Sequence, residues 1–184
     1  MGFTTTSYPL KRHDKIYNFP RLASEWKKIK HTLEPNNWYR DNQTMVQYSE
    51  YDDDIWTDGC GSLSNRIQQR QKQITTGKEY CILNPLYEGT IFEEIISDLG
   101  GTRARVMIKE EKTAYSVHAD ITFRCHLALE TNSDAYFIFP KEQKVFHIPA
   151  DGNVYIVDTT RPHTFVNCGP DRTHLVFNVD AISI

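Results

Sequence analysis

Residues Tyr115–Glu130 read YSVHADITFRCHLALE, an apolar, β-prone run that is interrupted by ionisable side chains. Such a run predicts a strand, and strands that pack a core seldom accept groups that must be hydrated or paired. Residues two apart on a strand face the same side, so His118 shares a face with Asp120, and Arg124 shares one with His126. We therefore expect this stretch to turn polar groups into the mouth of a barrel.

The C-terminal half of the chain continues as short β-prone runs separated by turn residues. Valine, isoleucine, phenylalanine and tyrosine dominate the runs, and pairs such as Asp151–Gly152 and Gly169–Pro170 separate them. The runs cover residues 102–110, 120–130, 134–140, 144–150, 153–158, 163–167 and 172–180. Strands of this number and spacing predict a mainly β fold, either a sandwich or a jelly-roll barrel.

The N-terminal half carries two helical patterns. Residues 19–33, FPRLASEWKKIKHTL, space their apolar side chains at helical intervals, which predicts an amphipathic helix. Residues 90–101, TIFEEIISDLGG, begin with a capping box of Thr90 and Glu93 and end at a glycine pair, which predicts a second helix. The polar residues 49–80 fit either a surface loop with a short helix or a lid.

The bulk composition is that of a globular protein. The chain has 184 residues, of which 39% are hydrophobic, and a net charge of −3. We expect a single domain over residues 1–184, in which residues 1–100 form a helical and loop part that buttresses barrel strands in residues 101–184. The near-neutral charge gives no electrostatic case for nucleic acid or a membrane surface as a partner, and the oligomeric state is left open.

The location is predicted from what the sequence lacks. No apolar run approaches the roughly 20 residues that span a bilayer, and residues 1–15 are polar, without the apolar core of a signal peptide. The four cysteines are scattered and form no CxxC pair. Because this pattern fits neither a disulfide framework nor a cysteine-based zinc site, we expect reduced thiols and a cytoplasmic protein.

A candidate metal site joins the HxD pair to a distant histidine. His163 lies 43 residues beyond Asp120, at the start of a β-prone run and just after a turn. Together, His118, Asp120 and His163 have the composition and the spacing of the facial triad of non-haem Fe(II) oxygenases. Such a triad occupies one face of the metal and leaves the opposite positions for a co-substrate and O₂. We therefore predict that these three residues are the metal ligands and the catalytic centre.

Arg172 is a candidate anchor for a co-substrate. It lies nine residues after His163, and a hairpin over residues 163–175 would bring the two residues onto adjacent strands. A guanidinium binds a carboxylate by a bidentate pair. A dicarboxylate held in this way at one end can chelate iron with its other end, and 2-oxoglutarate fits this description.

At these residues the chain resembles the aspartyl/asparaginyl β-hydroxylase family of Fe(II)/2-oxoglutarate oxygenases. The resemblance runs from Arg103 to Asp180 and is carried by HADITFRCHLAL, ADGNVYIVDTTRPHTFVN and DRTHLVFNVD. Residues 1–100 match the family only loosely. Asp120 separates the chain from the vertebrate membrane-bound members, which have no carboxylate at that place, and aligns it with small bacterial members that carry HxD.

The resemblance implies a double-stranded β-helix, the cupin-like form of the jelly-roll barrel. It also implies oxidative decarboxylation of 2-oxoglutarate to succinate and CO₂, coupled to hydroxylation of a substrate, with Fe(II), 2-oxoglutarate and O₂ required and ascorbate as the reductant in vitro. His118 and His163 would be iron ligands by this match. Arg172 and His126 would bind 2-oxoglutarate, and Arg124 would contact either 2-oxoglutarate or a substrate carboxylate. Arg124 could instead be a structural residue in a buried ion pair.

Further residues are candidates for the substrate pocket and for the support of the site. Arg105 alternates with apolar neighbours and is either a pocket residue that meets a substrate carboxylate or an ordinary strand arginine. Tyr115 either lines the pocket or packs. Asp158 and Asn167 flank His163 and are candidates to orient it. The predicted substrate bears a carboxylate and is a free amino acid or an Asp/Asn-type residue of a peptide.

Three alternatives remain open at this point. Taken singly, His118, His126 and His163 could each be a core residue with satisfied hydrogen bonds. The chain could also be a cupin-type metal protein with an activity that does not use 2-oxoglutarate, or a small-ligand binding module. Arg172 distinguishes a 2-oxoglutarate oxygenase from such a cupin-type metal protein, because an enzyme that does not use 2-oxoglutarate has no need of an anchor for it.

Overall fold

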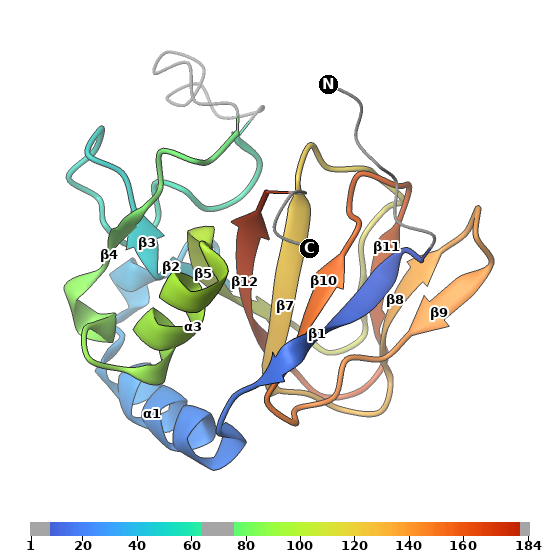
Figure 1. The fold of residues 1–184 in the computed structure, drawn as a ribbon, viewed down its shortest axis with the longest axis horizontal. Helices are drawn as coiled ribbons and strands as arrows, with labels where there is room; N and C mark the ends of the chain where they lie inside the picture. Colours follow the sequence, from blue (N-terminus) through green and yellow to red (C-terminus); the bar gives the residue numbers. More distant parts are fainter. Residues whose placement is uncertain (1–7, 64–75, 181–184) are drawn as a thin grey trace.

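The computed structural model describes residues 8–63 and 76–180, and its centre is a six-stranded antiparallel sheet (Figure 1). In spatial order, this sheet consists of β1 (Leu10–Ile16), β10 (Asn153–Val157), β7 (Phe123–Glu130), β12 (Arg172–Val179), β5 (Thr102–Lys109) and β2 (Gln43–Met45). A four-stranded sheet contains β6 (Thr113–Ala114), β11 (Thr164–Asn167), β8 (Ala135–Phe139) and β9 (Lys144–Phe146). A two-stranded sheet pairs β3 (Gln47–Tyr48) with β4 (Ile82–Leu83).

Two α-helices from the N-terminal half, α1 (Phe19–Thr32) and α3 (Ile91–Leu99), lie on one face of the six-stranded sheet (Figure 1). Helix α1 begins where the Asn18 side chain accepts a hydrogen bond from the Arg21 N–H. The Thr90 side chain accepts one from the Phe92 N–H at the start of α3, and α3 ends at Gly100 in the left-handed region, φ 58°. Both helices are therefore confirmed. Short 3₁₀ turns, Pro35–Asn37 and Pro85–Tyr87, follow α1 and precede α3.

Alternation along the strands divides the apolar residues between two cores. On β7, Cys125 and Leu127 pack with the helices in a cluster that includes Trp26 and Phe92. Burial of each large side chain of this kind contributes about 1.5–3 kcal/mol. The opposite face of the sheet lies against the four-stranded sheet, where residues such as Phe137, Phe139 and Phe165 form the second cluster. The prediction of a mainly β jelly-roll barrel with N-terminal helices is confirmed.

The two edge strands of the large sheet come from the N-terminal half, where the sequence predicted only helices and loops. β1 pairs with β10, and β2 pairs with β5. β1 reads LKRHDKI and is mostly exposed, so it lacks the apolar alternation by which a half-buried strand is recognised. β2 has three residues, too few to show any period.

Two local predictions in the C-terminal half were wrong. The strand expected to begin near Asp120 starts only at Phe123, and His118 instead forms an isolated bridge with His163. The expected hairpin over residues 163–175 does not form either. β11 lies in the four-stranded sheet and β12 in the six-stranded one, so their residues face each other across the barrel.

The polar residues 49–80 are described only in part, because residues 64–75 lie outside the described residues, and the prediction of a short helix or lid falls mainly on them. In the described part, the Asp54 carboxylate accepts hydrogen bonds from the N–H groups of Trp56 and Thr57 and so stabilises a local turn. Across residues 8–63 and 76–180, no helix combines the length and the apolar character that crossing a bilayer requires.

Candidate metal centre and adjoining cavities

His118, Asp120 and His163 lie together at one end of the barrel. Their potential ligand atoms are all within 4.8 Å of one another. The backbone fixes this arrangement, because the His118 N–H donates to the His163 carbonyl at 3.0 Å and the His163 N–H donates back at 2.8 Å. The Asp120 N–H donates to the Thr159 carbonyl at 2.7 Å, which ties the second ligand to the same loop. The three predicted ligands are therefore brought together by main-chain contacts.

The two imidazoles are oriented in the same way. Nδ1 of His118 lies 2.8 Å from the Ser116 carbonyl, and Nδ1 of His163 lies 2.9 Å from the Arg161 carbonyl. A carbonyl only accepts hydrogen bonds, so each Nδ1 carries the proton and each Nε2 keeps a lone pair for a metal. Burial lowers the pKa of His163, although the nearby Asp120 opposes this effect. A neutral imidazole is the form that binds a metal.

The Asp120 carboxylate is divided between two roles. Its Oδ1 accepts from Nη2 of Arg124 at 2.8 Å, and its Oδ2 lies 3.8 Å from Nε2 of His163. Oδ2 is buried and has no hydrogen-bond partner among the described residues. A buried carboxylate oxygen without a partner is costly, and a cation between the two imidazoles and this oxygen would remove that cost. The two nitrogen donors and one oxygen donor fit Fe(II).

The hydrogen bonds that the described residues give Asp158 and Asn167, the two residues expected to orient His163, do not go to His163. The buried Asp158 carboxylate accepts from the Thr160 hydroxyl and from Nε of Arg161 at 2.8 Å. Asp158 thus holds Arg161, whose carbonyl orients His163. Its influence on His163 is therefore indirect, whereas a direct contact was predicted. The Asn167 side chain donates to the carbonyls of Lys109, Glu110 and Pro170, so it ties loops together at the other end of β11.

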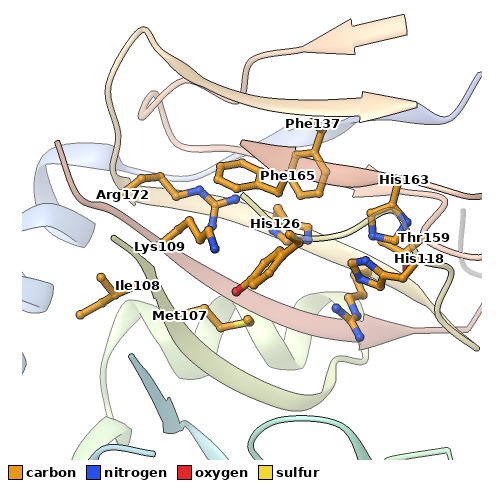
Figure 2. Close-up of a pocket in the computed structure, with 12 residues that line it drawn as sticks. Met107, Ile108, Lys109, His118, His126, Phe137, Thr159, His163, Phe165 and Arg172 are labelled. Atoms are coloured by element: carbon orange, nitrogen blue, oxygen red, sulfur yellow. The ribbon is translucent and has the colours of Figure 1, made fainter. Parts of the chain in front are cut away.

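A narrow pocket of about 40 Å³ runs from His118 and His163 into the barrel (Figure 2). In Figure 2, His118 and His163 lie at one end of the pocket and Arg172 with Lys109 at the other, with His126 between them. Its lining residues are Met107, Ile108, Lys109, Tyr115, His118, Arg124, His126, Phe137, Thr159, His163, Phe165 and Arg172.

Arg172 is buried in this pocket without a described carboxylate partner. Its guanidinium lies over the Phe165 ring, 4.0 Å from the centroid, and Nε has no hydrogen-bond acceptor among the described residues. Burial lowers the pKa of Arg172 to about 9. Lys109, the register partner of Arg172, is the second cation, and its ammonium lies 3.6 Å from the Tyr115 ring centroid. Burial also lowers the Lys109 pKa.

His126 lies in the middle of the pocket. Both of its ring nitrogens are buried without a partner among the described residues, and burial holds its pKa well below the usual value. Its ring contacts Phe137 edge to face at 4.9 Å and lies 5.7 Å from the ring of His174. His174 is also buried in the interior, and its ring nitrogens likewise lack partners among the described residues.

A larger cavity, about 480 Å³ in volume, adjoins the candidate metal centre and is lined in part by His118 and Asp120. It shares Met107, Tyr115, His118 and Arg124 with the narrow pocket, so the two spaces meet at these residues, one of which is a predicted ligand. Its lining residues are Gln43, Gly61, Ser62, Leu63, Thr76, Arg103, Arg105, Met107, Tyr115, His118, Ala119, Asp120, Ile121, Thr122 and Arg124. The structure thus places Arg105 and Tyr115 in the wall of the cavity.

Two cations of the candidate site were not predicted from the sequence: Lys109 as a ligand-binding group and Arg103 as a cavity residue. A signal for both was available. Arg103, Arg105, Met107 and Lys109 alternate along β5, so a pocket that receives Arg105 receives the others as well. Arg103 has a positive φ of 53°, which is unusual for a residue with a side chain and is not predictable from the sequence.

No family model matches the chain, and no curated protein matches it either. Solved structures similar to the chain include the viral collagen prolyl hydroxylase of Paramecium Bursaria Chlorella virus-1, with 10% identity over 97% of this chain and 98% of that one, at a TM-score of 0.49. The Trichoplax adhaerens prolyl hydroxylase in complex with a hypoxia inducible factor peptide fragment has 10% identity over 96% of this chain and 86% of that one, also at 0.49. A 2OG-Fe(II) oxygenase family oxidoreductase from Burkholderia pseudomallei has 19% identity over 44% of each chain, at 0.37. Likenesses this distant assign no activity and no family to the chain.

Proposed function

We propose that the protein is a small Fe(II)- and 2-oxoglutarate-dependent dioxygenase of the aspartyl/asparaginyl β-hydroxylase family. The observation that carries the proposal is the convergence of His118, Asp120 and His163. Oδ2 of Asp120 has no hydrogen-bond partner among the described residues, and the Nε2 atoms of the two imidazoles are available. These three residues would hold Fe(II). Bound there, the metal supplies the activation of O₂ that hydroxylation of an unactivated C–H bond requires.

The narrow pocket supports 2-oxoglutarate as the co-substrate. Its far end holds two buried cations, Arg172 and Lys109, without a described carboxylate partner for Arg172, and its near end opens at the metal ligands. A dicarboxylate would pair with the cations at the far end through one carboxylate and reach the metal at the near end with the other. Arg172 would bind the distal carboxylate, and His126 would donate or accept a hydrogen bond along the chain of the co-substrate. Phe137 and Phe165 exclude water from this space.

The larger cavity is the proposed substrate site, because His118 and Asp120 line it whereas Arg172 lines only the narrow pocket. Arg105, Arg124 and Tyr115 line it and would bind a carboxylate-bearing substrate, either a free amino acid or an Asp/Asn-type residue of a peptide. The four cysteines are unpaired, which supports the predicted cytoplasmic location. We retain the single-domain organisation over residues 1–184 as part of the proposal.

The test is succinate formation from 2-oxoglutarate by protein reconstituted anaerobically with Fe(II) and then supplied with ascorbate and air. Wild type is compared with His163→Ala and with His31→Ala, whose histidine is exposed at the end of α1. Turnover is expected for wild type and His31→Ala, and none for His163→Ala. Metal binding without succinate formation, across a panel of amino acids and Asp/Asn peptides, would refute the proposal in favour of a metal protein that does not use 2-oxoglutarate.

A further inference from the structure

Three arginines, Arg103 and Arg105 from β5 and Arg124 from β7, line the larger cavity. Arg103 and Arg105 are 5% and 2% exposed, so both guanidinium groups are largely removed from bulk water. A buried guanidinium is normally paired with a carboxylate or phosphate, because the loss of its hydration is costly. The acceptors that these arginines find therefore indicate what the cavity binds.

Among the described residues, the acceptors that Arg103 and Arg105 contact carry no charge. Arg103 donates from Nε to the Gly59 carbonyl at 2.9 Å and from Nη2 to the Gly61 carbonyl at 2.6 Å. Arg105 donates from Nη1 to the Arg103 carbonyl at 3.3 Å, and its Nε lies 3.3 Å from the sulfur of Met107. Carbonyl and thioether acceptors orient the two guanidinium groups but leave their positive charges uncompensated.

The acidic side chains do not correct this imbalance. Among the residues that line the cavity, the one acid is Asp120. Its Oδ1 is already paired with Arg124, and its Oδ2 faces His163. Residues 64–75 contain no Asp or Glu, so that part of the sequence offers no counter-charge. Burial and the neighbouring arginines together lower the pKa of Arg105 well below its usual value. Burial, followed by the charge of Arg124, lowers the pKa of Arg103 to about 10.

Resting on the proposed function, we propose that the substrate carries a negatively charged side group, a carboxylate or a phosphate monoester, that is bound by Arg105 with Arg103 beside it. The corresponding neutral amide or alcohol is then a poor ligand. This selects the acidic member from the Asp/Asn-type substrates that the function leaves open. Discrimination of this kind is strong, because a neutral group would leave the buried guanidinium groups without a counter-ion.

The first experiment measures binding without turnover. Protein is loaded with Mn(II) in place of Fe(II) and saturated with 2-oxoglutarate under anaerobic conditions, so that the pocket of Arg172 is filled and cannot take up the probes. Calorimetric titration then compares aspartate with asparagine, glutamate with glutamine, and phosphoserine with serine. We expect at least tenfold tighter binding of the acidic member in one pair, and the pair in which this appears distinguishes a carboxylate from a phosphate. Equal affinities within every pair, or no binding of any acidic member, would overturn the proposal.

The second experiment replaces the proposed anion-binding group. Arg105→Met keeps the length of the side chain and removes its charge. The preference for the acidic member should fall at least tenfold, the affinity for Mn(II) should stay unchanged, and Tm should rise because an uncompensated buried charge is removed. Arg12→Met, at an exposed position on β1, should change none of these. A lower Tm with the acidic preference intact would show that Arg105 is structural and would overturn the proposal.

The two proposals fail separately. Acidic preference that depends on Arg105, in a protein that forms no succinate, would refute the dioxygenase and retain the anion site. Succinate formation stimulated equally by aspartate and asparagine would support the dioxygenase and refute the anion site.

Discussion

Arg124 and Asp120 form an ion pair, with 2.8 Å between Nη2 and Oδ1, in which both side chains are 17% exposed. The resemblance implied that Arg124 contacts 2-oxoglutarate or a substrate carboxylate, and the carboxylate that it contacts in the structure is that of a predicted metal ligand. Because Oδ1 is held in this way, Oδ2 is the atom left beside Nε2 of His163. We therefore predict that Arg124 positions Asp120, in addition to the contact with a substrate carboxylate proposed for it.

Arg124→Gln should weaken Fe(II) or Mn(II) binding by about 10–100-fold, the usual effect of removing a group that orients a metal ligand. The measurement is a metal titration of the anaerobic protein, with Arg12→Gln as the matched control. Arg124 is also a cation close to the metal, so its loss removes a repulsion. Tighter metal binding by Arg124→Gln would show that repulsion outweighs positioning, and would refute the role assigned here.

Arg172→Met should raise the KM for 2-oxoglutarate about 10–150-fold, as expected for the loss of about 1.5–3 kcal/mol from a hydrogen bond between charged groups. The kcat at saturating 2-oxoglutarate should fall much less, because the residue lies at the far end of the pocket from the ligands. Steady-state succinate formation over a range of 2-oxoglutarate concentrations checks this. A fall in kcat with an unchanged KM would show that Arg172 does not anchor the co-substrate.

Arg161→Met should lower the stability of the loop that carries His163. Nε of Arg161 donates to the buried Asp158 at 2.8 Å, and Nη1 donates to Glu142 at 3.2 Å. Removal of the guanidinium leaves the Asp158 carboxylate buried without its cation, which we expect to reduce the free energy of unfolding by about 3–5 kcal/mol. Urea unfolding measures this effect.

A double variant, Asp158→Asn with Arg161→Met, serves as the control for that experiment. It removes the buried charge together with its partner and should recover part of the lost stability. If the double variant loses as much free energy of unfolding as Asp158→Asn and Arg161→Met lose separately when summed, the ion pair contributes nothing of its own.

His126 and His174 should make the protein sensitive to acid. Burial holds the pKa of both well below the usual value of about 6.5. Above pH 6.5 both histidines are neutral in the folded and the unfolded state, so their contribution to stability is fully present. As the pH falls below 6.5, only the unfolded state takes up protons, and stability declines by up to about 1.4 kcal/mol per pH unit for each histidine.

Urea unfolding between pH 7.5 and 5 tests this, at roughly half-unit steps. His174→Phe keeps a ring in the interior but cannot take up a proton. The loss of stability per pH unit should therefore be smaller by the contribution of one histidine. His31→Asn, on the exposed face of α1, should leave the slope unchanged. An unaltered slope in His174→Phe would show that His174 is not buried as a neutral imidazole.

Most of the fold was predictable from the sequence, because its signals are local. The helices of residues 19–33 and 90–101 are marked by apolar spacing and by capping residues, and both form. Seven of the eight described strands after residue 101 are marked by β-prone runs between turns, and only the two-residue β6 is not. Edge strand β1 was missed since an exposed edge needs no apolar face, and its position depends on hydrogen bonds to β10, which is far away in the sequence.

The candidate residues of the site could be named from the sequence alone. An HxD pair, a later histidine and a later arginine form a recognisable pattern, because residue type and spacing restrict which groups can bind a metal and a dicarboxylate. How these residues meet could not be predicted, because it depends on the tertiary structure. His118 joins His163 through backbone hydrogen bonds outside any regular strand, and Arg172 reaches the pocket from the opposite sheet. Arg124 turns to Asp120, and Arg105 has no counter-ion among the described residues, because side-chain partners depend on strand pairing and burial across the barrel.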